Sequence, residues 1–234
     1  MKRALSCTSF VYSAEHIMRK QQSGFTLVEI AIVLVIIGLL LGGVLKGQEL
    51  VNSARVKSMA NDFRNVPVLI YGYQDRFRRL PGDDNAIANE RFAGFTPATT
   101  GGALGNGFIE GLWNSSTLTD ESALFWQHVR GAGLAAGSIN ISATNLPTNA
   151  EGGRFGVQST PIPPIAGLIG SFYACSESIS ARAAQQLDAT LDDGTPNGGI
   201  MRATTTATTA SNDAAAAAAA TNWNASTYTV CMAY

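Results

Sequence analysis

One segment near the start of the chain constrains everything that follows it. Phe25–Leu45 is a run of 21 residues that is apolar apart from Thr26 and Glu29. A helix needs about 20 apolar residues to cross a bilayer, so this run has the length of a transmembrane helix. Glu29 is costly in such a helix, because a carboxylate near the bilayer centre costs roughly 2.5–3.5 kcal/mol on insertion scales. We therefore expect Glu29 to have a partner and a function.

The residues around Glu29 form a contiguous motif. Arg19 and Lys20 precede Ser23-Gly24, and Phe25-Thr-Leu-Val-Glu29 follows and opens the apolar run. Over residues 18–48 the chain resembles the type IV prepilin signature, which is a short basic leader ending in Gly, then Phe-Thr-Leu-Val-Glu and a hydrophobic helix. An unrelated single-pass anchor or an uncleaved signal anchor would explain the apolar run. Neither alternative explains Glu29 or the Gly24-Phe25 pair.

The resemblance implies a processing step. A prepilin peptidase would cut between Gly24 and Phe25 on the cytoplasmic side and N-methylate Phe25, which makes residues 1–24 a leader. A start at Met18 would give a more ordinary prepilin leader and is the start that we favour. Independently, the Lys and Arg residues before the span predict a cytoplasmic N-terminus and an exported C-terminal part: Lys2, Arg3, Arg19 and Lys20.

Charge argues against a nucleic-acid partner. Removing residues 1–24 removes four of the 16 Lys and Arg and one of the 17 Asp and Glu, which changes the formal charge from −1 to −4. Nucleic-acid binding would need clustered basic residues, and the mildly acidic balance of the mature sequence gives no sign of such a footprint.

Residues 46–80 have the pattern of an amphipathic helix that continues the membrane helix 25–45. Apolar residues recur at alternating spacings of three and four: Val56, Met59, Phe63, Val66, Ile70, Tyr73, Phe77 and Leu80. Leu80-Pro81-Gly82 is expected to stop the helix, and Pro67 is a weak point inside it. The period would suit a coiled-coil seam, but a stripe this rich in aromatic residues favours packing against a sheet of the same domain.

Residues 81–234 are expected to form an exported head with a modest core. We predict helices at 121–130 and at 178–191, the second capped by Ser178 or Ser180, and strands at 199–203 and 227–234. Residues 204–222 are nearly all Thr, Ala, Ser and Asn, and we expect an exposed, mobile insertion there, with a marginal helix as the alternative. The predicted fold class is α+β, a long N-terminal helix packed against a small antiparallel β-sheet head.

Two cysteines remain after the leader is removed, Cys175 and Cys231. In an oxidising compartment two thiols in a small domain most often pair, and the alternative is two separate buried thiols. The resemblance adds that type IV pilins commonly bracket a C-terminal surface region with such a bridge, so residues 176–230 are similar to that region.

The sequence offers little for catalysis or a cofactor. No His pair or Cys-x-x-Cys provides a zinc site, and neither Gly-x-Ser-x-Gly nor a Walker loop is present. His128 is expected to have a surface or core role. Asp83-Asp84 and Asp192-Asp193 could bind calcium as some pseudopilin heads do, but roles in turns and at helix ends are favoured.

The resemblance therefore implies a structural subunit, not an enzyme. The expected partners are other pilin-like subunits, the prepilin peptidase, and an assembly platform with its ATPase. The expected location is the bacterial inner membrane, with a periplasmic head, and afterwards an extracellular or periplasmic filament. Glu29 is expected to pair with the Phe25 amine and to set the register of subunits. The alternatives are a pseudopilin of a type II secretion system and a membrane-anchored binding protein that does not polymerise.

Overall fold

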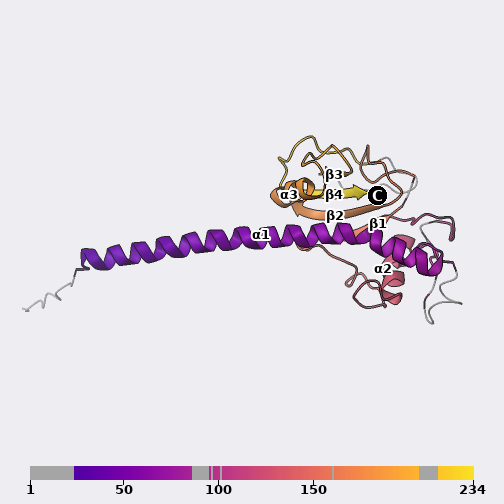
Figure 1. The fold of residues 1–234 in the computed structure, drawn as a ribbon, viewed down its shortest axis with the longest axis horizontal. Coiled ribbons are helices and arrows are strands. Elements are labelled where there is room, and N and C mark those ends of the chain that lie inside the picture. Colours follow the sequence, from indigo (N-terminus) through magenta and orange to yellow (C-terminus); the bar gives the residue numbers. More distant parts are fainter. Residues whose placement is uncertain (1–23, 86–94, 96, 101, 160, 206–215) are drawn as a thin grey trace, which may run out of the picture. The chain divides into compact units, whose positions relative to one another are not determined.

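A computed structural model describes the chain except for residues 1–23, 86–94, 96, 101, 160 and 206–215. The chain divides into two compact units, residues 1–47 and residues 48–234. Its elements are α1 (Leu27–Phe77), α2 (Glu121–Gly131), β1 (Phe155–Gln158), β2 (Tyr173–Ser180), α3 (Ala181–Leu191), β3 (Met201–Thr204) and β4 (Thr227–Ala233). The α+β class predicted from the sequence is confirmed, with a long N-terminal helix and a small antiparallel sheet (Figure 1).

The sheet has the strand order β1-β2-β4-β3, and all three pairings are antiparallel. Period-2 alternation divides its side chains between two apolar clusters. Ala174, Val230 and Met232 face a core that includes residues of α1, while Cys175 and Cys231 belong to a second cluster on the other face. Both faces of this small sheet are therefore covered.

The amphipathic stripe of α1 packs within its own domain, as the periodicity predicted. Phe63, Val66 and Ile70 are fully buried, and the Phe63 ring meets that of Phe155 edge to face with centroids 5.3 Å apart. The helix ends at Phe77, earlier than the predicted stop near Leu80, because Arg78 adopts a left-handed conformation with φ 58° and its N–H donates to Gln74 O at 2.7 Å.

Two predictions for the head are wrong at the residue level. The predicted helix at 178–191 begins only at Ala181, because Ser178–Ser180 complete β2 after a register shift between Ser176 and Ile179. Neither serine side chain caps α3. Instead, Glu151 accepts from both the N–H and the hydroxyl of Ser180, at 2.7 and 3.0 Å.

The low-complexity segment also differs from the expectation. Thr204 is a buried residue of β3, and the described part from residue 216 onwards is neither helical nor free of the domain. Ala220 N–H donates to Ala203 O at 2.7 Å, and Ala217 forms a parallel bridge with Ile165. Alanine methyl groups are small enough for this extended backbone to approach β3 and the second apolar cluster, the one that contains Cys175 and Cys231. Ala219 packs against that cluster. Residues 206–215 of the predicted insertion lie outside the described residues.

Candidate functional site

The site predicted from the sequence lies at the start of α1. Thr26 precedes the first helical residue, and its N–H and hydroxyl donate to Glu29 Oε2 at 2.8 and 2.9 Å. In return the Glu29 N–H donates to Thr26 Oγ1 at 3.3 Å. This reciprocal Thr-x-x-Glu arrangement is a capping box, which satisfies backbone donors that the first turn of a helix leaves open.

A role for Glu29 was predicted from the sequence, but Thr26 was not identified as its partner. The Thr-x-x-Glu spacing is a known signal for a helix start and could have revealed the contact. Both bonds from Thr26 reach Oε2, and Oε1 accepts none from a described residue. One carboxylate oxygen thus serves the helix start, and the other is open to a second donor.

Gly24 and Phe25 precede the helix in an exposed, non-helical segment. The Phe25 side chain is 83% exposed, and no atom lies within 4 Å of the position that a Cβ on Gly24 would take. Exposed, non-helical backbone is the kind that proteases cleave. The leader up to residue 23 lies outside the described residues, and cleavage between Gly24 and Phe25 stays a prediction.

The apolar part of α1 is exposed along its whole length. Leu27 and Leu39 are 91% and 73% exposed, and the large apolar side chains between Ile30 and Leu45 are also exposed. Within the described part of the chain, α1 is the one helix long and apolar enough to cross a membrane. An uninterrupted apolar surface of this length is unfavourable in water and supports anchoring in a bilayer.

The segment that contains this apolar run is similar to a known protein family. A model of the prokaryotic N-terminal methylation motif matches residues 19–45. The chain carries the type IV pilin and pseudopilin signature. The matched residues include Gly24, Phe25 and the Thr26–Glu29 capping box together with the apolar run. No curated protein and no solved structure matches the chain significantly. A pilin-like subunit, and hence a structural protein, is the function class that the motif supports.

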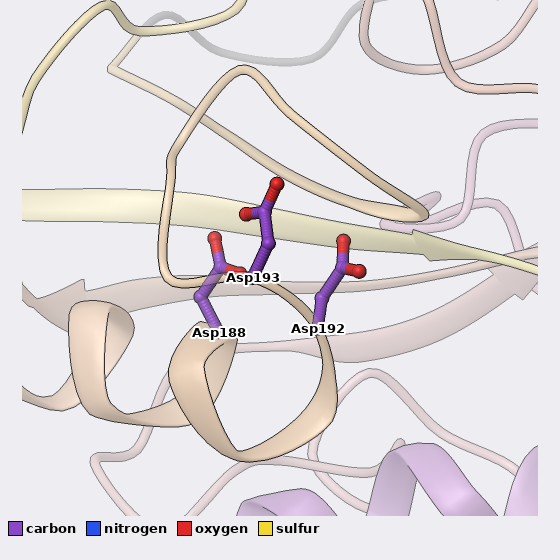
Figure 2. Close-up of side chains that lie close together, drawn as sticks. All are labelled: Asp188, Asp192 and Asp193. Carbon is purple, nitrogen blue, oxygen red and sulfur yellow. The ribbon is translucent and has the colours of Figure 1, made fainter.

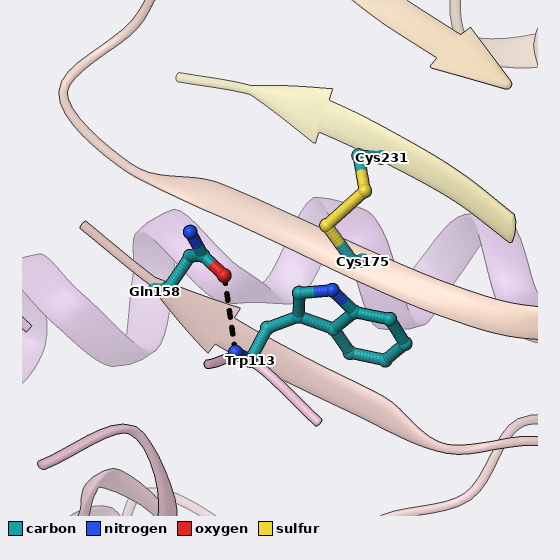
Figure 3. Close-up of a disulfide and its surroundings, with 4 residues drawn as sticks. All are labelled: Trp113, Gln158, Cys175 and Cys231. Atoms are coloured by element: carbon teal, nitrogen blue, oxygen red, sulfur yellow. Dashed lines mark hydrogen bonds between the residues drawn. A yellow bond between two sulfur atoms is a disulfide. The ribbon is translucent and has the colours of Figure 1, made fainter. Parts of the chain in front are cut away.

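The head of this pilin-like subunit contains the predicted disulfide. Cys175 and Cys231 are bonded and lie directly opposite each other on β2 and β4, with Cα atoms 4.1 Å apart (Figure 3). The bond is fully buried beside the Trp113 ring, and the Trp113 N–H donates to Gln158 Oε1 at 3.0 Å. The bridge ties the final strand to the centre of the sheet, as the sequence suggested.

Three aspartates meet where α3 ends: Asp188, Asp192 and Asp193, with one oxygen of each within 4.8 Å of the others (Figure 2). Each carboxylate also holds backbone. Asp188 accepts from Gly194 N–H at 3.0 Å, Asp192 from Met201 N–H at 2.8 Å, and Asp193 from Thr195 N–H at 2.8 Å. Asp188 is fully buried, its Oδ2 has no partner, and burial raises its pKa to about 7. Carboxylate oxygens are ligands that divalent cations bind, but a proton on Asp188 also relieves the repulsion among the three side chains.

Asp83 and Asp84, the second pair considered for calcium, are committed to the fold. Asp83 accepts from the N–H groups of Gly105, Asn106 and Gly107 and so holds that loop. Asp84 accepts from the Tyr73 hydroxyl at 2.8 Å in the interior. Asp83 therefore holds a turn, the role favoured for the pair, whereas Asp84 binds a buried side chain of α1.

Glu121 and His128 are buried in α2, and both have strongly shifted pKa values. Burial raises the pKa of Glu121 to about 7, and the nearby carboxylates of Asp83, Glu110 and Asp120 add to the shift; its Oε2 accepts from Glu110 N–H at 2.8 Å. Burial lowers the pKa of His128 to about 4, and its Nδ1 accepts from Gly82 N–H at 2.8 Å. His128 is therefore a neutral core residue, one of the two roles expected for it.

Proposed function

We propose that the chain is a structural subunit of a type IV pilus-like filament. The observation that carries the proposal is the methylation motif joined to an exposed apolar helix that begins with the Thr26–Glu29 capping box. A helix surface that is apolar on all sides suits the membrane before assembly and the interior of a helix bundle after it.

Maturation would follow the prepilin route. The peptidase removes residues 1–24 and methylates Phe25, with the leader on the cytoplasmic side and the head in the periplasm. An assembly platform and its ATPase, encoded elsewhere, would then move the processed subunit from the inner membrane into the filament.

The new Phe25 amine and Glu29 Oε1 are the natural charge pair of the assembled subunit. Each charge is costly in an apolar surrounding, and pairing offsets part of that cost. A pair between neighbouring subunits would also specify their axial register, which an apolar helix surface specifies poorly. Because the capping box engages only Oε2, it leaves Glu29 Oε1 available to such an amine.

Two measurements test the proposal. Mass spectrometry of membrane-extracted protein should find an N-methylated terminus at Phe25, and Gly24→Val should retain the leader. Antibodies against the head should then label sheared surface fibres. A mature terminus inside the apolar run would contradict the prepilin assignment.

The alternatives predict different results in the same assays. A type II secretion pseudopilin would be cleaved and methylated identically, but its deletion would block export of secreted proteins. A membrane-anchored binding protein would stay in the membrane fraction and would not enter sheared fibres.

For the aspartates at the end of α3 we propose a structural role without a resident metal. The three backbone contacts shape the turn between α3 and β3, and the raised pKa of Asp188 lets this carboxyl bind a proton close to neutral pH. Calcium is the alternative ligand. Isothermal titration with Ca²⁺ distinguishes the two, because a calcium site would give a saturable heat signal that Asp188→Ala weakens, whereas a structural role without metal predicts no such signal.

A further inference from the structure

A groove opens between α1, the second half of α2 and the segments that follow α2. It has a volume of about 490 Å³, and its apolar lining includes Leu69, Trp126, Leu134 and Phe155. Trp126 and Phe155 are each 6% exposed, so the groove lies directly over the domain core. The Asp62 side chain lies on its α1 side.

The Asp62 carboxylate lacks a counter-charge. It is half-buried, burial raises its pKa, and no described residue forms an ion pair or hydrogen bond with it. Arg130 also lines the groove, but its two terminal nitrogens donate to Ser138 O and Asn145 O at 3.1 and 3.0 Å. A partly desolvated carboxylate beside an apolar lining matches a ligand with an apolar stem and a cationic end, which describes a Lys or Arg side chain.

The same helix presents such side chains on its other flank. Lys57 and Arg64 are exposed, seven residues apart on one side of α1, and neither forms an ion pair with a described residue. Each residue of a helix advances about 100°, so Arg64 lies about 200° from Asp62 around the axis. Tyr71, one more heptad along and 55% exposed, continues this ridge and packs edge to face against Phe172.

We propose that the Asp62 groove of one copy receives the Lys57–Arg64 ridge of a second copy. The proposal rests on the filament function above and names a contact through which two heads recognise each other. Groove and ridge lie on opposite flanks of one helix, so a copy that uses one keeps the other free. Such a heterologous contact does not close on itself and continues into an open polymer.

The contact contributes specificity more than affinity. The groove is small, and the apolar part of α1 offers far more area for association, but apolar area alone does not select one orientation. A charge pair at a fixed height on the head penalises wrong registers, where Asp62 would meet an apolar or acidic surface.

Charge reversal and its reciprocal test the contact in the full chain. Asp62→Lys should reduce the amount of processed subunit in sheared filaments about tenfold relative to the membrane pool. The reason is that two like charges held in one contact repel each other strongly enough to weaken association by at least a factor of ten. The double variant Lys57→Glu/Arg64→Glu should show a similar loss. Combining all three substitutions should restore most of the wild-type ratio. Arg182→Glu, at an exposed position of α3, is the matched control and should assemble normally.

Folding is checked in every variant by formation of the Cys175–Cys231 bond and by protease resistance of the head. Normal assembly of folded Asp62→Lys, or failure of the triple variant to recover while its head is folded, would overturn the inference. If the wild-type chain never enters filaments, the filament function fails instead. Co-expression of Asp62→Cys and Arg64→Cys copies then tests the contact between groove and ridge separately. A disulfide-crosslinked dimer in the membrane supports the contact, and the absence of that dimer refutes it.

Discussion

Tyr234 supplies a hydrogen bond that Pro67 removes from α1. Proline has no N–H, so the carbonyl of Phe63, four residues earlier, lacks its usual helical donor. The Tyr234 hydroxyl donates to this carbonyl at 2.5 Å, across a sequence separation of 171 residues. The helix continues through Pro67, and this contact also attaches the residue after β4 to the spine of the head.

The contact predicts a coupling that a double-mutant cycle can measure. Tyr234→Phe keeps the ring but leaves the Phe63 carbonyl without a donor, which should cost about 1–3 kcal/mol of unfolding free energy. In a Pro67→Ala background the new N–H can donate to Phe63 O, so Tyr234→Phe should cost less than about 0.5 kcal/mol. The expected coupling is therefore about 1–2 kcal/mol.

Guanidinium denaturation of the four detergent-purified variants, followed by tryptophan fluorescence, gives the cycle. Tyr71→Phe, on an exposed ring, is the matched control and should change the midpoint little. Equal costs of Tyr234→Phe in the two backgrounds would show that the hydroxyl acts through some contact other than the carbonyl that Pro67 leaves open.

Three further predictions concern the disulfide, the buried acids and Glu29. Replacing both Cys175 and Cys231 by Ala should lower stability by about 4 kcal/mol, from the chain-entropy cost of the 56-residue separation they close, and dithiothreitol should then have no further effect. Glu121 and Asp188 have pKa values raised to about 7, so the folded state binds protons that the unfolded chain releases, and stability should rise on acidification from about pH 7.5 to 5.5. Glu121→Gln and Asp188→Asn should each flatten this dependence of stability on pH. His128, with its pKa lowered to about 4, has the opposite effect on stability below about pH 6.5. An unchanged slope in both variants would show that these two carboxyls do not cause the pH dependence. Glu29→Ala should leave insertion and cleavage intact but reduce the subunit in sheared filaments relative to the membrane, and normal incorporation would show that Glu29 does not set register.

Periodic features of this fold could be predicted from sequence, and features that join distant residues could not. The α1 stripe and α2 were found because burial on one face repeats every three to four residues. The start of α3 was misplaced because the residue that holds its N-terminus, Glu151, lies 29 positions away from Ser180. β2 was missed for a related reason, since Ser178 in a left-handed conformation breaks the alternation that would have marked the strand's end.

The alanine run shows a different limit of composition. Alanine and threonine provide little apolar surface, so the segment was expected to remain outside the domain. Its backbone is used instead, because Ala220 and Thr204 place hydrogen bonds along the edge of β3. The unpaired N–H and C=O groups of an edge strand need hydrogen-bond partners, and any segment whose backbone can lie close enough can provide them. The need for such a cover depends on the strand order, which the composition of the segment does not show.

The difference between requirements on adjacent residues and contacts between distant residues explains why the family match ends at residue 45. A bilayer and a membrane peptidase act on a continuous segment, so their requirements appear as length, hydropathy and a few adjacent residues around Gly24 and Glu29. The head has to satisfy only its own core, which many sequences can do. Contacts that distinguish this subunit from others must then lie on the surface of the head. The groove lined by Asp62 is the candidate that we propose for such a contact, because its unpaired carboxylate contributes nothing evident to the core around it.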